Sequence, residues 1–293
     1  MSRRSRVPRD ARGRRGSRVP RDARGRRGSR VRGWAPAAAL AAVAVAIVAV
    51  VLRPRDAGDR YVALGDSYAV GTGAASLDGY APRFARWLRD RRAGAIPTFL
   101  NMGVGGENTT SLLQGGQLGR ALDAIGDGHN RTRVVTLDIG TNELLAPECI
   151  HGVDVPRCPF RRNLTAILDE LQAALREEPA PARLLVMGLF APFPDAGPIA
   201  ARSVRILLQG LDGRIDCAGT GLQIGMNDLI ACIGARHGAT YVETFATFAR
   251  DPHRLISKDG LHPSDAGHAA IARRFAHALV SAPPPPPHAA AYR

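Results

Sequence analysis

Two short motifs near opposite ends of the sequence hold residue types that together can carry out acyl transfer. Ser67 stands in the segment YVALGDSY, at the end of a short apolar run. Asp259 and His262 stand close together in the segment DGLHP, far toward the C-terminus. A serine hydroxyl becomes a useful nucleophile when a neutral imidazole takes its proton, and a carboxylate fixes the tautomer of that imidazole. Ser67, His262 and Asp259 therefore form a candidate triad, although a serine in this position also suits a helix cap.

Two further motifs could stabilise negative charge that develops on a reacting carbonyl. The segment NMGVGGEN at 101–108 is rich in glycine, which lets backbone N–H groups approach a ligand closely. The segment GTNE at 140–143 places the side-chain amide of Asn142 after an apolar run, where it can donate a hydrogen bond into a cleft. The alternatives are a simple glycine turn and a turn-forming asparagine.

Along the chain, short β-branched runs alternate with longer amphipathic stretches. This alternation predicts a parallel sheet covered by helices on both faces, a three-layer α/β/α domain over residues 60–281. In such sheets ligands bind at the carboxyl ends of the strands, which is where the chemical motifs fall. The expected strands are 61–64, 97–100, 133–139, 183–190 and 239–243, and the expected helices 79–93, 160–177, 199–216, 227–237 and 265–281.

In this order, the motifs resemble the blocks of the SGNH (GDSL) hydrolase family, named for its Ser, Gly, Asn and His. Ser67, Gly106, Asn142 and the DGLHP segment each match one block, and residues 227–243 resemble the helix and last strand of that family. The resemblance implies a flavodoxin-like fold with five parallel strands. It also implies an oxyanion hole built from the Ser67 and Gly106 amides and the Asn142 side chain.

By this resemblance the expected activity is hydrolysis of carboxylic esters through an acyl-enzyme, without a metal or an organic cofactor. The substrate would be a small-molecule or lipid ester, and Phe190 and Phe193 in the segment LFAPFPDAGP would form one wall of its pocket. Tyr68 and Glu143 depart from the residues usual in the family. Two alternatives stay open: acyl transfer or deacetylation on a cell-envelope glycan, and an inactive tethered binding module.

The positive charge of the chain is concentrated at its N-terminus. The formal net charge is +14, and residues 1–33 contain 14 arginines and two aspartates, which leaves 14 − 12, or about +2, for the rest. The segment RVPRDARGRRGS occurs at 6–17 and again at 18–29. Such a composition predicts a disordered tail, so a nucleic-acid-binding domain is not expected. The tail would orient the chain in a membrane, bind nucleic acid or anionic lipid, or lie upstream of the true start codon.

Residues 34–52 form a nineteen-residue stretch without a charge, about the length that crosses the hydrocarbon core of a membrane. We expect a signal anchor that keeps the arginine-rich tail in the cytoplasm and exports the hydrolase domain, with a linker at 53–59. A cleaved signal peptide and a buried core helix are the alternatives. Residues 282–293, which include a proline run, predict an extended tail.

Export agrees with the four cysteines of the chain. Four cysteines allow three pairings, of which we favour the local one, Cys149 with Cys158 and Cys217 with Cys232. Four free buried thiols are the alternative. The spacing of cysteine and histidine resembles no zinc site, and the sequence leaves the oligomeric state open.

Overall fold

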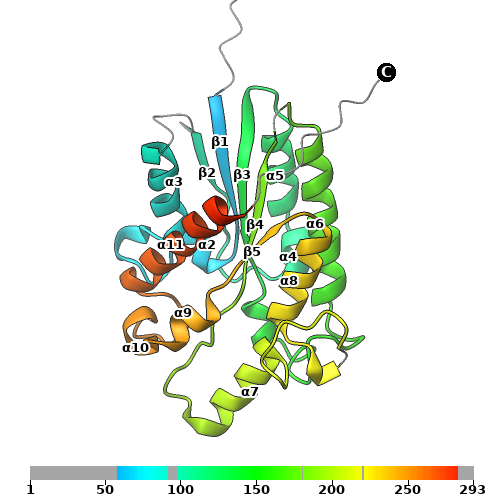
Figure 1. The fold of residues 1–293 in the computed structure, drawn as a ribbon, viewed down its shortest axis with the longest axis vertical. Helices are drawn as coiled ribbons and strands as arrows, with labels where there is room; N and C mark the ends of the chain where they lie inside the picture. The colour runs from blue at the N-terminus through cyan, green and yellow to red at the C-terminus, as the bar shows by residue number, and fades with distance from the viewer. Residues whose placement is uncertain (1–57, 92–97, 180, 220, 283–293) are drawn as a thin grey trace, which may run out of the picture. The chain divides into compact units, whose positions relative to one another are not determined.

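The computed structural model of the chain describes residues 58–91, 98–179, 181–219 and 221–282. Five strands in these residues form one parallel sheet in the order β2-β1-β3-β4-β5 (Figure 1). This is the flavodoxin-like order, so the expected α/β fold is confirmed. The strands are β1 (Gly58–Gly65), β2 (Thr98–Asn101), β3 (Asn130–Asp138), β4 (Arg183–Met187) and β5 (Thr240–Val242).

Two groups of helices cover the two faces of the sheet, as parallel strands joined by crossover helices require (Figure 1). One face is covered by α3 (Tyr80–Arg91), α9 (Phe245–Ala249), α10 (Pro252–Leu255) and α11 (Asp265–Ser281). The other is covered by α4 (Thr109–Gln114), α5 (Gln117–Ile125), α6 (Phe160–Arg176) and α8 (Met226–Arg236). The remaining helices are α2 (Ser67–Val70), α7 (Gly197–Gln209) and three short 3₁₀ helices, Ala75–Leu77, Asn142–Leu145 and Gly221–Gln223.

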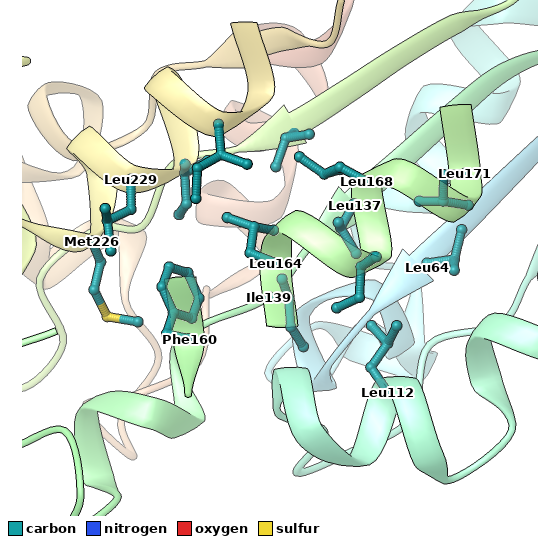
Figure 2. Close-up of a cluster of buried hydrophobic side chains, with 14 of the residues drawn as sticks. Leu64, Leu112, Leu137, Ile139, Phe160, Leu164, Leu168, Leu171, Met226 and Leu229 are labelled. Carbon is teal, nitrogen blue, oxygen red and sulfur yellow. The ribbon is translucent and has the colours of Figure 1, made fainter. Parts of the chain in front are cut away.

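The side chains of β1 show how one strand serves both cores. Tyr61 and Ala63 point into the core beneath α3 and α11, whereas Val62 and Leu64 point into the core beneath α6. Figure 2 shows the second core, where Leu64 and Leu137 of the sheet face leucines of α4 and α6. Because β1 is buried on both faces, the residues that follow it are held firmly in place.

Several element boundaries differ from those expected. The helix expected over 199–216 ends at Gln209, because Gly210 has a φ of +65° and a Cβ there would lie 2.2 Å from the carbonyl oxygen of Gln223. Strand β1 begins at Gly58, so the last two residues of the expected linker belong to the sheet. Helices α4 and α5 were not expected from the sequence, since both are short and follow glycine-rich segments.

The predictions about the two termini concern residues that lie outside the described ranges. These are the arginine-rich tail at 1–33, the anchor at 34–52, most of the linker, and the proline-rich tail beyond Ala282. In the part of the chain that the structure describes, no helix is both long and apolar enough to cross a membrane.

Both disulfides join cysteines that are close in sequence, as expected. Cys149 pairs with Cys158 in the segment after β3, and Cys217 pairs with Cys232, which lies on α8. No free cysteine remains among the described residues. Both bonds brace long connections near the carboxyl ends of the strands, where few regular hydrogen bonds hold the backbone.

Replacing Cys217 and Cys232 together by serine should lower the free energy of unfolding by about 3 kcal/mol, because the unfolded chain regains the entropy of a fifteen-residue loop. Urea denaturation of wild type and variant, with and without a reductant, measures this loss. The variant should respond to reductant less than wild type does. An equal response of both proteins would contradict the pairing.

Candidate active site

Ser67 lies at a sharp turn between β1 and α2, at the carboxyl edge of the sheet. Gly65 ends the strand with a φ of +146°, and a Cβ there would lie 2.3 Å from Asp138. The Oδ1 atom of Asp66 accepts a hydrogen bond from the Tyr68 amide at 2.9 Å and so caps α2. Ser67 therefore begins a helix, where backbone N–H groups have no partner within the helix.

A glutamine that the sequence analysis missed fixes the end of β1. The Oε1 atom of Gln117 accepts a hydrogen bond from the Gly65 amide, and its Nε2 atom donates to the Gly65 carbonyl, both at 2.9 Å. Gln117 is fully buried. Two hydrogen bonds to the backbone of one residue, Gly65, hold the turn before Ser67 in a single orientation. The one sequence signal for this role is that a glutamine side chain can both donate and accept a hydrogen bond. Every glutamine shares that property, so the sequence does not single out Gln117.

The structure brings His262 and Asp259 to Ser67 from the far end of the sequence. The Nε2 atom of His262 lies 3.0 Å from Ser67 Oγ, and its Nδ1 atom lies 2.7 Å from Asp259 Oδ2. A neutral imidazole in this position can accept the hydroxyl proton while Nδ1–H donates to the carboxylate. The three side chains thus form the arrangement that nucleophilic catalysis by serine requires.

Asp259 is held as a carboxylate by its own loop. Burial alone raises the pKa of Asp259, but hydrogen bonds from Ser257, His262 and Leu261 outweigh burial and bring the pKa well below its ordinary value. Oδ1 accepts from the backbone amides of Leu261 and His262, both at 2.9 Å. An ionised Asp259 can therefore hold the Nδ1–H tautomer of His262 at any pH at which the protein would be assayed.

Glycine and tyrosine bring the 259–263 loop close to the serine turn. Gly73 has a φ of +92°, and a Cβ there would lie 2.3 Å from the Pro263 carbonyl oxygen and 2.9 Å from the Cβ of His262. The hydroxyl of Tyr68 donates to the Leu261 carbonyl at 3.1 Å, and its ring meets the His262 ring edge-on. Tyr68, one of the two departures from the family pattern, thus supports the histidine.

Asn142 and the Gly106 loop also meet at this edge. Nδ2 of Asn142 donates to the Glu107 carbonyl at 2.7 Å and lies 3.4 Å from Asp66 Oδ2. Gly106 has a φ of +77°, and a Cβ there would touch nothing within 4 Å. There is therefore free space beside the Gly106 backbone, and the asparagine amide binds the residue that follows it.

Glu143, the second departure from the family pattern, links the two segments. Its Oε1 atom accepts a hydrogen bond from the backbone amide of Thr109, the first residue of α4, at 2.6 Å. Burial raises the pKa of Glu143 above its ordinary value. Its other oxygen is buried with no hydrogen-bond partner. Glu143 therefore ties the Asn142 turn to the helix that follows the Gly106 loop.

Two buried aspartates lie directly beneath the serine turn. A side-chain hydrogen bond joins Asp66 to Asp138, and the hydroxyl of Tyr80 donates to Asp138 Oδ1. Burial raises the pKa of Asp66 to about 7 and raises that of Asp138 well above its usual range. Because two carboxylates cannot share a hydrogen bond without a proton, the Asp66–Asp138 pair holds a shared proton.

A second histidine joins the serine turn to the last helix. His268 on α11 accepts a hydrogen bond from the Tyr80 amide on Nδ1, at 3.1 Å, and its Nε2 atom donates to the Thr72 carbonyl at 2.9 Å. Burial lowers the pKa of His268 to about 4, so the ring is neutral. From sequence, this residue was not distinguished from the other histidines. It is a bridge between backbones rather than a proton carrier.

The two phenylalanines expected at the substrate wall differ in position. Phe190 is buried and stacks between Tyr68 and Phe248, so it does not line an open surface as expected. Phe193 is half-buried with a φ of +58°, and its amide donates to the Gly260 carbonyl at 2.6 Å. A bulky residue with positive φ is strained, and here it abuts the 259–263 loop. Phe193 therefore stays a candidate substrate contact, whereas Phe190 supports Tyr68 from behind.

No group of three or more His, Cys, Asp or Glu side chains in residues 58–91, 98–179, 181–219 and 221–282 is arranged to hold a metal ion. The site described above consists of hydrogen-bonding groups only.

Comparison with known families places the chain. The model of the GDSL-like lipase/acylhydrolase family matches residues 63–270, which include all the residues of the site. The chain therefore belongs to this family and is a carboxylic ester hydrolase by class. No curated protein sequence matches it.

Solved structures share the fold at low sequence identity. The chain resembles the lipase Lip_vut3 from a goat rumen metagenome, with a TM-score of 0.52 and 19% identity over 75% of this chain and 96% of that one. It also resembles Axe2, an acetylxylan esterase from Geobacillus stearothermophilus, with a TM-score of 0.52 and 16% identity over 78% of this chain and 96% of that one. Identities this low establish the common fold.

Replacing Asp138 by asparagine tests the shared proton. A pKa that folding raises means that the folded state binds more protons than the unfolded state, so wild-type stability should fall as the pH rises from about 4 to about 7. In Asp138→Asn the side-chain N–H donates to Asp66, so no titrating proton is needed between the two groups. The fall in stability with rising pH should therefore be smaller than in wild type. Urea denaturation between these pH values measures it.

The control is Asp138→Leu, which removes the side-chain hydrogen-bond partner that Asp66 and the Tyr80 hydroxyl share. It should lose about 1–3 kcal/mol of unfolding free energy across the pH range. An Asp138→Asn variant with the same pH dependence as wild type would show that Asp138 does not carry the shared proton.

Proposed function

We propose that this hydrolase uses Ser67 as its nucleophile, His262 as general base and acid, and Asp259 to orient and stabilise the imidazole. The observation that carries the proposal is the continuous chain of hydrogen bonds, 3.0 Å from Ser67 Oγ to His262 Nε2 and 2.7 Å from Nδ1 to Asp259 Oδ2. Distances in this range let a proton pass when the substrate binds.

The reaction proceeds in two acyl transfers. His262 takes the hydroxyl proton of Ser67 as Oγ attacks the ester carbonyl, and it then gives that proton to the departing alkoxide. The acyl group is now an ester of Ser67. In the second half, His262 takes a proton from water, the hydroxide attacks the acyl-enzyme, and the acid leaves as Ser67 regains its proton. Asp259 stays ionised throughout.

The oxyanion of each tetrahedral intermediate would be held by the Ser67 amide, the Gly106 amide and the Asn142 side chain. Support comes from the free space beside the Gly106 backbone and from the hydrogen bond between Asn142 Nδ2 and the Glu107 carbonyl, which brings the asparagine next to the Gly106 loop. Such donors act strongly because the protein holds them in place before charge develops. Loss of one typically costs about 10²–10³ in turnover.

We further propose that the domain works outside the cytoplasm. Two disulfides among the described residues suit an oxidising compartment. The apolar stretch at 34–52 would either anchor the chain or be removed after export. Acyl esters of a cell-envelope glycan are a second candidate substrate, and the fold is shared with an acetylxylan esterase.

Ser67→Ala should lower kcat on p-nitrophenyl acetate by about 10⁴ or more, and His262→Gln by a similar factor, because the nucleophile and base act as one unit. Asp259→Asn should lower kcat by about 10⁴, since His262 then loses its anionic partner. KM should change little. Steady-state kinetics on the full chain measures all three.

Ser281→Ala is the matched control, an exposed serine at the end of α11, and it should keep wild-type kinetics. Full activity of Ser67→Ala would reject the serine mechanism. A folded wild-type protein with no activity on esters of any chain length would favour the binding module.

A further inference from the structure

The large apolar side chains that the described part of the chain exposes are gathered at one edge of the sheet. Eight of the nine follow the carboxyl ends of the strands, the edge that carries Ser67. Only Val280, on the last turn of α11, lies elsewhere. The eight are Leu77, Val104, Leu145, Ile150, Ile199, Leu211, Ile215 and Leu222.

Contacts confirm that the segments bearing these residues belong to this edge. Val104 donates its amide to the carbonyl of Gly65, at the end of β1. A Cβ at Gly140, just after β3, would meet the end of the Met226 side chain, so α8 begins at this edge and the 210–225 segment that leads into it does too. A Cβ on Gly152 would lie 3.8 Å from Leu222. Figure 1 shows α7 beyond the ends of the strands, at the bottom of the view.

Helix α7 is exposed over most of its length. Of its thirteen residues only Leu208 is fully buried, while Ile199 is 83% exposed. Ile199, Arg202 and Ile206 are spaced three and four residues apart, so they share the outward face of the helix. Two isoleucines around an arginine on an outward face favour contact with a surface that is both apolar and anionic.

The charge of α7 is positive along its whole length. The helix contains Arg202 and Arg205 and no acidic residue, although Asp195 and Asp212 flank it. Neither arginine makes an ion pair with another described residue. Because residues 34–293 carry a net charge of only about +2, this is a local feature rather than a share of a basic surface.

We propose that the carboxyl edge, with α7 at its centre, docks on a bilayer that contains anionic lipids, and that Ser67 acts on an ester held in that bilayer. The proposal rests on the proposed function of Ser67. Apolar side chains around the serine would enter the interfacial layer, while Arg202 and Arg205 would pair with lipid phosphates.

The test compares two esters on the full chain. One is p-nitrophenyl acetate in solution, and the other is p-nitrophenyl palmitate carried in vesicles of phosphatidylcholine with phosphatidylglycerol. Ile199→Asp should lower the rate on the vesicle ester about tenfold or more, because it removes an isoleucine that would enter the bilayer and adds a charge that anionic lipid repels. The rate on the soluble ester should not change, which also shows that the variant is folded.

Val280→Asp is the matched control, a 65% exposed apolar residue away from this edge, and it should keep both rates. The Arg202→Gln and Arg205→Gln double variant should lose the preference for anionic over pure phosphatidylcholine vesicles. Residues 34–52 are present in every variant, so their effect cancels.

Equal vesicle rates for Ile199→Asp and Val280→Asp would overturn the docking while leaving the hydrolase intact. A wild-type dimer in solution that Ile199→Asp dissociates would also overturn it, because the edge would then bind a second copy of the chain. A wild type inactive on both esters would reject the proposed function, and the docking with it.

Discussion

The site depends on close approach between two backbones that are far apart in sequence. The turn after β1 carries Ser67, and the loop before α11 carries His262, and the hydrogen bond between their side chains forms only because these segments touch. Gly73 permits that contact, since a Cβ there would overlap the Pro263 carbonyl. Gly65 likewise permits the serine turn to lie against Asp138, since a Cβ at Gly65 would overlap that residue. Larger residues at either position would force these segments apart and break the hydrogen bond between Ser67 and His262.

Hydrogen bonds between buried polar groups beneath the site hold these two segments in fixed positions. Tyr80 donates to Asp138 from its hydroxyl and to His268 from its amide, so one residue of α3 joins β3 to α11. Asp66 meets both Asp138 and the Asn142 amide. Buried polar networks are costly when any member is unpaired, and this one is paired throughout by keeping a carboxyl protonated and an imidazole neutral. The result is a rigid polar layer under the turn that carries Ser67, which is only partly exposed.

The sequence was sufficient for the fold and for the residues that meet at the site. Short β-branched runs marked all five strands, and the family motifs marked Ser67, Asn142 and His262. The supporting residues could not be predicted, because their partners lie far away in sequence: Gln117 binds Gly65, and His268 binds the Thr72 carbonyl. Phe190 was expected at the pocket wall but is buried, because a loop sequence does not show which way a side chain points. The exposure of α7 could not be predicted from the sequence either, because it depends on which other elements pack against the helix.

Covalent trapping tests the central claim most directly. A p-nitrophenyl alkylphosphonate presents a phosphorus centre that an activated serine attacks, with release of p-nitrophenol, to give a stable tetrahedral adduct that resembles the transition state. Peptide mapping by mass spectrometry locates the adduct. We expect a single adduct on Ser67, formed far more slowly in His262→Gln. Inactivation of the enzyme by an adduct on any other residue, or an undiminished rate in His262→Gln, would contradict it.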